Sequence, residues 1–134
     1  DIGIEPYLVT SAVHLVMAQR LVRKVCPHCK KTYEPDPKAL MALFGPEHQG
    51  GTFYKGEGCK QCKGRGFLGR TAIFEMLEIT PGLSELILKG ASAGALREKA
   101  LEEGFVTLKE NAAKRALDGT TTVEEALGVS TEAL

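Results

Sequence analysis

Two pairs of cysteines are the residues of this 134-residue chain with the most defined chemistry. The first pair lies in Cys26-Pro27-His28-Cys29 and, after 29 intervening residues, the second lies in Cys59-Lys60-Gln61-Cys62. Each C-x-x-C turn presents two thiolates at a separation that suits a tetrahedral zinc ion, and two such turns complete one site. The chain has four cysteines, so none is left over. The spacing predicts one structural zinc ion with the ligands Cys26, Cys29, Cys59 and Cys62.

The residues around both pairs favour metal binding. Lysine and arginine residues flank the cysteines and favour the thiolate over the thiol. Gly58, Gly64 and Gly66 allow tight turns, and we expect their backbone N–H groups to point at sulfur. Four cysteine ligands leave no open coordination position for water, so we expect a structural rather than a catalytic metal.

Two other uses of these cysteines have to be weighed. Cys26 and Cys29 alone fit the motif of thiol–disulfide oxidoreductases. That chemistry requires a strand before the motif and a helix that begins at the first cysteine, whereas we predict a helix before Cys26 and find prolines soon after Cys29. Two structural disulfides would need an oxidising compartment, and the first residues do not resemble a signal peptide. Structural zinc is therefore preferred.

The three histidines are weaker candidates. His28 lies inside the first cysteine turn and could replace a cysteine as ligand, although a supporting or solvent-facing position is favoured. His14 falls in an apolar segment, which is typical of a core histidine. His48 falls in a loop and has no partner at the spacing of metal ligands.

The hydrophobic pattern predicts an α+β fold that is mostly helical. Leu8, Ala12, Leu15 and Val16 recur at helical spacing, so we predict a helix over residues 5–22, with a short strand at 21–25 that leads into the first cysteine pair. A further short strand is expected to start at Phe53 and Tyr54, and another strand is expected at 70–79. Further helices are expected at 37–44, 81–89, 92–103, 107–118 and 122–128.

Several helix ends are predicted from their sequence signals. Thr107 and Thr122 begin capping boxes, because each is followed three residues later by glutamate. Gly90, Gly104 and Gly119 stand where helices are expected to end, and glycine adopts the left-handed backbone that such ends require.

Charge is unevenly distributed along the chain. The formal net charge is zero, so no global field attracts nucleic acid or a membrane. Residues 1–74 contain 11 Lys/Arg and 6 Asp/Glu, whereas residues 75–134 contain 6 and 11. The basic residues cluster around the cysteines. Two interpretations stay open: the two halves pair within one fold, or the basic surface contacts an acidic partner.

Several stretches, in the same order along nearly the whole chain, are similar to one family. They are residues 4–11, 18–23, 26–29, 58–62, 66–75, 104–105, 108 and 123–127. Together they resemble the C-terminal third of the type II secretion and type IV pilus assembly ATPases. The resemblance implies the last helix and strand of a RecA-like ATPase core at residues 1–25, a tetracysteine zinc-binding subdomain at 26–66, and a strand with a helical C-terminal subdomain at 67–134.

The resemblance also implies a function for a parent protein. That protein would be a cytoplasmic hexameric motor, peripheral to the inner membrane, which binds ATP and Mg²⁺ and works with copies of itself and with an inner-membrane platform protein. Its phosphate loop and catalytic residues would lie upstream of Asp1, so we expect no catalytic and no nucleotide-binding residue in this chain, and no ATP hydrolysis. Whether Gln19, Arg20 or Arg70 reaches the nucleotide stays open.

The alternative comes from a different class of protein, a zinc-ribbon module that contacts nucleic acid or protein through its basic turns. Aromatic side chains are 6% of the chain and few lie near the basic residues, so stacking platforms for bases are scarce. Nucleic acid is therefore not expected as a partner.

Overall fold

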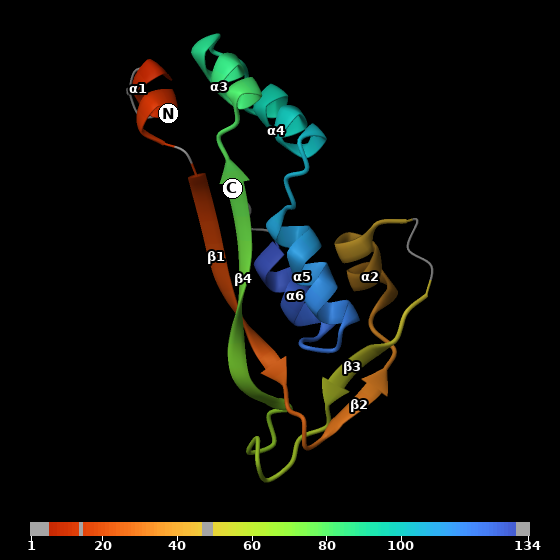
Figure 1. Ribbon diagram of the computed structural model, residues 1–134. Helices are drawn as coiled ribbons and strands as arrows, with labels where there is room; N and C mark the ends of the chain where they lie inside the picture. Colours follow the sequence, from red (N-terminus) through yellow and green to blue (C-terminus); the bar gives the residue numbers. More distant parts are fainter. Residues whose placement is uncertain (1–5, 14, 47–49, 131–134) are drawn as a thin grey trace. The chain divides into compact units, whose positions relative to one another are not determined.

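The computed structural model of the chain describes residues 6–13, 15–46 and 50–130. These residues form six helices and four strands (Figure 1). In chain order the elements are α1 (Pro6–Ala12), β1 (Leu15–Val25), β2 (Lys30–Tyr33), α2 (Pro37–Phe44), β3 (Phe53–Gly56), β4 (Phe67–Glu78), α3 (Pro81–Leu88), α4 (Ala93–Glu102), α5 (Leu108–Leu117) and α6 (Val123–Ser130). The expected α+β class is confirmed.

The chain divides into two compact units. The first consists of Asp1–Ala18 and Glu75–Val106, and the second of Gln19–Phe74 and Thr107–Leu134. The cysteine pairs belong to the second unit.

In the first unit, helix α3 packs against α1 and α4. Thr80 begins α3, because its Oγ1 accepts a hydrogen bond from Leu83 N at 3.2 Å, and Ser92 caps α4 in the same way through Ala95 N at 3.1 Å. These side chains satisfy N–H groups that a helix start leaves without a partner. Leu83 and Ala100 are buried in this unit.

The second unit contains the main hydrophobic core. Helices α5 and α6 lie side by side, and α2 packs against both (Figure 1). The N-cap half of each predicted capping box is observed, with Thr107 Oγ1 accepting from Glu110 N at 3.1 Å and Thr122 Oγ1 accepting from Glu125 N at 3.0 Å. The buried core residues are Val22, Leu43, Phe53, Ile73, Leu108, Ala112, Ala116, Val123 and Ala126.

Two strand pairs lead to and from the cysteines. Strand β1 pairs with β4 in one sheet, and β2 pairs antiparallel with β3 in another, with Lys30 opposite Gly56 and Tyr33 opposite Phe53. The first cysteine pair lies between β1 and β2, and the second lies between β3 and β4. Each cysteine pair therefore connects a strand of one sheet to a strand of the other.

The predicted helix over residues 5–22 is wrong beyond Ala12. Residues 15–25 form strand β1, in which exposed and more buried residues alternate up to Val22. A short apolar run does not by itself distinguish a strand from a helix, and here the pairing with β4 makes the segment extended. The expected strand at 70–79 is observed as Phe67–Glu78. His14 and His48 lie outside the described residues.

Candidate metal centre

The four cysteine sulfurs come together in one cluster. All four Sγ atoms lie within 4.8 Å of one another. The Sγ–Sγ distances are 3.7 Å between Cys26 and Cys59, 3.9 Å between Cys29 and Cys62, and 3.7 Å between Cys59 and Cys62. A tetrahedron of sulfurs about 2.3 Å from a central ion has edges of about 3.8 Å. The arrangement could therefore hold one metal ion.

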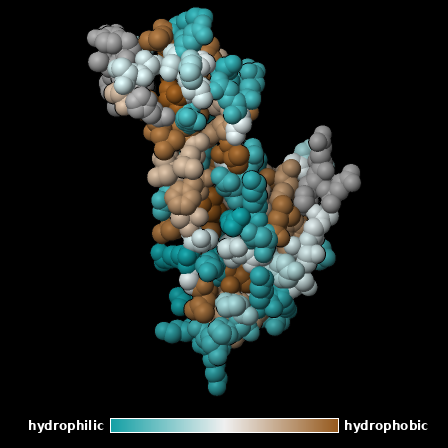
Figure 2. Space-filling view, viewed as in Figure 1, coloured by the Kyte–Doolittle hydropathy of each residue, from teal (hydrophilic) through white to brown (hydrophobic). Residues whose placement is uncertain are grey.

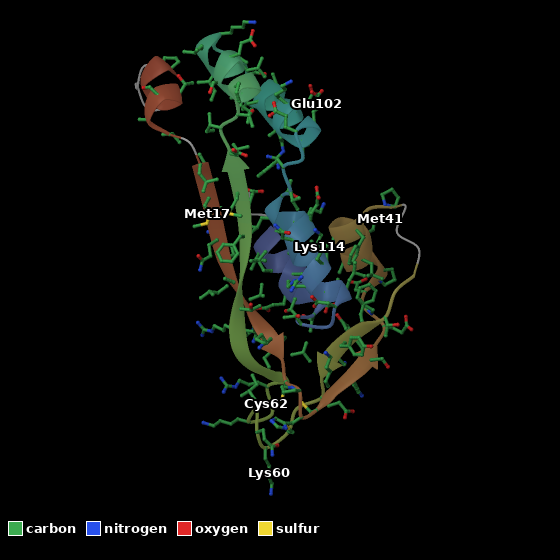
Figure 3. The ribbon with its side chains drawn as sticks, in the orientation of Figure 1. Met17, Met41, Lys60, Cys62, Glu102 and Lys114 are labelled. Carbon is green, nitrogen blue, oxygen red and sulfur yellow. The ribbon has the colours of Figure 1, made fainter. Side chains whose placement is uncertain are left out.

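Backbone hydrogen bonds hold the sulfurs in place. Cys26 N donates to Gly66 O at 2.9 Å, which ties the end of β1 to the start of β4. Residues 59–66, here called the second cysteine turn, are closed by Lys63 N donating to Lys60 O at 3.2 Å and by Gly64 N donating to Cys59 O at 2.9 Å. Cys26 and Cys62 are completely buried. Figure 3 shows Cys62 where the strands meet, with Lys60 pointing away from it at the tip of the turn.

Three backbone N–H groups point at sulfur. Gly58 N lies 3.3 Å from Cys29 Sγ, and both Cys59 N and Gly66 N lie 3.2 Å from Cys62 Sγ. The predicted role is confirmed for Gly58 and Gly66, whereas Gly64 donates to a carbonyl oxygen instead. Such contacts orient metal-binding thiolates and stabilise their charge.

Burial and N–H donors act in opposite directions on the pKa values of Cys62 and Cys29. Burial raises the pKa of Cys62, but the N–H groups of Cys59 and Gly66 oppose it and lower the pKa to about 6. Burial raises the pKa of Cys29 to about 12, against the single N–H of Gly58. The N–H donors thus favour the thiolate at Cys62, and a bound cation would stabilise thiolate ligands in the cluster.

Two glycines let the backbone cross beside the cluster. A Cβ atom at Gly66, whose φ is +80°, would lie 2.5 Å from Gly56 O, and one at Gly56 would lie 2.2 Å from Gly66 O. The sequence analysis did not predict a role for Gly56. The run Gly56-Glu57-Gly58 directly before Cys59 could have indicated a close backbone approach there. Only glycine allows this close approach.

Two basic residues near the cluster form ion pairs within the chain. Arg23 forms an ion pair with Glu125 at 3.0 Å and lies 4.1 Å above the Phe67 ring. Lys31 pairs with Glu57, which lowers the pKa of that carboxyl. The pair between Arg23 and Glu125 joins the basic and acidic halves of the sequence within the second unit.

The other candidate residues do not join the cluster. His28 is exposed, and within the described residues the grouping that could hold a metal consists of the four cysteines alone. Gln19 and Arg70 are exposed on β1 and β4. Arg20, half-buried on β1, donates to Gln19 O at 2.9 Å.

Comparison with known proteins identifies the family. The sequence model of the family described as "Type II/IV secretion system protein" matches residues 1–128. The chain belongs to this family. It is 43% identical over 131 residues to the type IV pilus assembly ATPase PilB of Myxococcus xanthus and 42% identical over 134 residues to that of Thermus thermophilus. It is 35% identical over 132 residues to the type II secretion system ATPase E of Vibrio cholerae.

The chain spans only part of each of these relatives. The three alignments cover 96%, 98% and 98% of this chain, but 23%, 15% and 26% of the relatives. Among the residues that the structure describes, no helix has the length and apolar character needed to span a membrane.

Proposed function

We propose that this chain is the zinc-binding C-terminal region of a cytoplasmic hexameric ATPase that powers type IV pilus assembly or type II protein secretion. One observation carries the proposal: almost the whole chain aligns with ATPases of both machines, while it covers at most 26% of the three relatives described above. ATP and Mg²⁺ would bind to the remainder of such a protein. Copies of the same protein and an inner-membrane platform protein would be its partners.

The metal in this proposal is a structural zinc ion held by Cys26, Cys29, Cys59 and Cys62. Four sulfurs at tetrahedral spacing suit zinc, because this ion binds soft thiolate ligands and has no redox role. A bound zinc ion would supply positive charge, which would let four thiolates lie together in this partly buried cluster. The chain's own residues do the rest, since the N–H groups of Gly58, Cys59 and Gly66 orient the sulfurs.

Exposed apolar side chains on β1 and β4 support the proposal that this chain packs against other parts of a larger protein. On β4, Leu68 and Phe74 in the second unit are about two-fifths exposed, and on β1 Leu21 is 54% exposed. In the first unit the same strands expose Leu15, Met17 and Met76. Figure 2 shows brown and tan side chains along these strands. Apolar surface of this kind is typical of an interface, and we propose that it packs against a RecA-like core.

By itself the chain is proposed to hydrolyse no ATP. Phosphoryl transfer by ATPases of the P-loop class uses backbone amides around the phosphates, a lysine on them, and a hydroxyl that holds Mg²⁺. The sequence from Asp1 to Leu134 has no G-x-x-x-x-G-K-[ST] pattern that would supply these groups.

Two measurements test the proposal together. Magnesium-dependent phosphate release is measured for this chain and for the full-length protein, and bound metal is counted by elemental analysis. We expect one zinc per chain, turnover by the full-length protein and none by this chain. Turnover by the chain alone would contradict the assignment of the chemistry to the remainder. An inactive full-length protein that binds single-stranded nucleic acid in a salt-dependent way would favour the zinc-ribbon alternative.

A further inference from the structure

The second cysteine turn presents a concentrated positive charge. Lys60, Lys63 and Arg65 lie on six consecutive residues that backbone hydrogen bonds close into one turn, and all three are exposed. The sequence from residue 58 to residue 74 contains no aspartate or glutamate. Figure 2 shows hydrophilic side chains over this end of the second unit, and Figure 3 shows Lys60 directed into solvent at the tip.

Lys60 and Lys63 differ from Arg65, whose Nε donates to Cys62 O at 3.3 Å, and from several other basic residues near the cluster. Arg23 and Lys31 have carboxylate partners within the chain, and Lys30 lies 4.8 Å above the Tyr54 ring. Over residues 6–13, 15–46 and 50–130, neither Lys60 nor Lys63 has a partner for its ammonium group. No carboxylate of the described residues therefore neutralises either ammonium group.

The backbone at Lys63 is a second and independent observation. Its φ is +56°, and Lys63 is the only residue other than glycine with a positive φ among the residues that the structure describes. Glycine would adopt this conformation without strain, as the neighbouring Gly64 and Gly66 do. A lysine therefore stands where the fold favours glycine, although its ammonium group forms no ion pair there. Backbone strain at an exposed lysine that forms no ion pair points to a function for its side chain.

We propose that the second cysteine turn docks an acidic peptide segment of a partner protein, with Lys60 and Lys63 as the main contacts. Charge complementarity selects the partner, and the rigid turn presents its cations with little loss of backbone freedom. A membrane surface fits less well, because the turn has no apolar side chain to insert and fewer cations than the 4–8 that typical lipid-binding clusters contain. Nucleic acid fits less well because the turn has no aromatic side chain. This inference concerns a surface and does not depend on the proposed ATPase role.

The experiment uses a fluorescein-labelled peptide of ten glutamates as the probe. Binding to the zinc-loaded chain is measured by fluorescence anisotropy at several salt concentrations. We expect the double variant Lys60→Glu/Lys63→Glu to weaken binding about tenfold, since two attractive contacts become repulsive. The matched control carries the same charge change on α5, Lys109→Glu/Lys114→Glu, and we expect it to bind like the unaltered chain. Zinc content and the urea midpoint verify that both variants are folded.

A third variant separates charge from backbone geometry. Lys63→Gly should unfold at an equal or higher urea concentration, because it relieves the left-handed strain, and should still weaken binding of the peptide. Equal weakening in the α5 control would overturn the proposal, because it would show a response to net charge alone. Tighter binding to anionic vesicles, made of phosphatidylcholine and phosphatidylglycerol, or to a single-stranded oligonucleotide than to the peptide would overturn the choice of an acidic protein segment.

Discussion

Replacement of Gly66 by alanine is expected to disrupt the cysteine cluster, because Gly66 supports it through both of its backbone polar groups. Its N–H donates to Cys62 Sγ at 3.2 Å, and its carbonyl oxygen accepts from Cys26 N at 2.9 Å. An added Cβ atom would lie 2.5 Å from Gly56 O, and the φ of +80° is unfavourable for alanine.

The expected size of the effect follows from these contacts. The left-handed backbone alone costs alanine about 1 kcal/mol. The clash involves a backbone oxygen rather than a flexible side chain, so the turn itself must move and the N–H···S contact is weakened. We expect the free energy of unfolding to fall by about 3 kcal/mol. We expect zinc affinity to fall roughly 100-fold, the upper end for loss of a contact that supports a metal ligand.

Gly64→Ala is the matched control. Gly64 also has a positive φ, +78°, but a Cβ atom there meets nothing within 4 Å. We therefore expect the free energy of unfolding to fall by about 1 kcal/mol from the backbone alone, with zinc affinity nearly unchanged. The comparison separates the close approach to Gly56 from the conformational preference of glycine.

Competition with a chromophoric zinc chelator gives the affinities, and urea unfolding followed by circular dichroism gives the stabilities. If both alanine variants bind zinc equally tightly and lose the same stability, the crossing of Gly66 over Gly56 has no energetic role. The reasoning about the cluster would then be refuted.

Three further predictions address the rest of the chain. Cys59→Ser should remove bound zinc and expose the amides between the two cysteine pairs to hydrogen exchange, while those of α5 and α6 stay protected; retained zinc would contradict it. Glu125→Gln should cost about 1 kcal/mol at neutral pH, because the ion pair with Arg23 is partly exposed. Burial raises the pKa of Glu125, but the hydrogen bonds from Arg23 outweigh this and leave the pKa lowered. The stability that this carboxylate contributes is present above its unfolded pKa and is lost as pH falls through the lowered folded pKa, so acid unfolding curves of the two proteins should converge at low pH. Leu21→Ser/Phe74→Ser should reduce self-association of the isolated chain in sedimentation experiments without lowering the urea midpoint, because both side chains are exposed on the strands.

Local signals in the sequence determined the cysteine cluster and several helix ends. The two C-x-x-C turns predicted which four residues cluster, because thiolates at that spacing suit one tetrahedral ion. The caps at Thr107 and Thr122 and the positive φ at Gly90, Gly104 and Gly119 are as expected. These features depend on hydrogen bonds within a few residues, so neighbouring residues are sufficient to specify them.

The tertiary structure decided what depends on distant residues. Residues 15–22 are an apolar run that fits a helix or a strand, and pairing with β4, about 50 residues later, makes them extended. The ion pair of Arg23 with Glu125 joins residues 102 positions apart, and the glycine crossing at Gly56 depends on how β3 passes the second cysteine turn. No local pattern encodes such contacts, because they form only when both segments are packed against the same core.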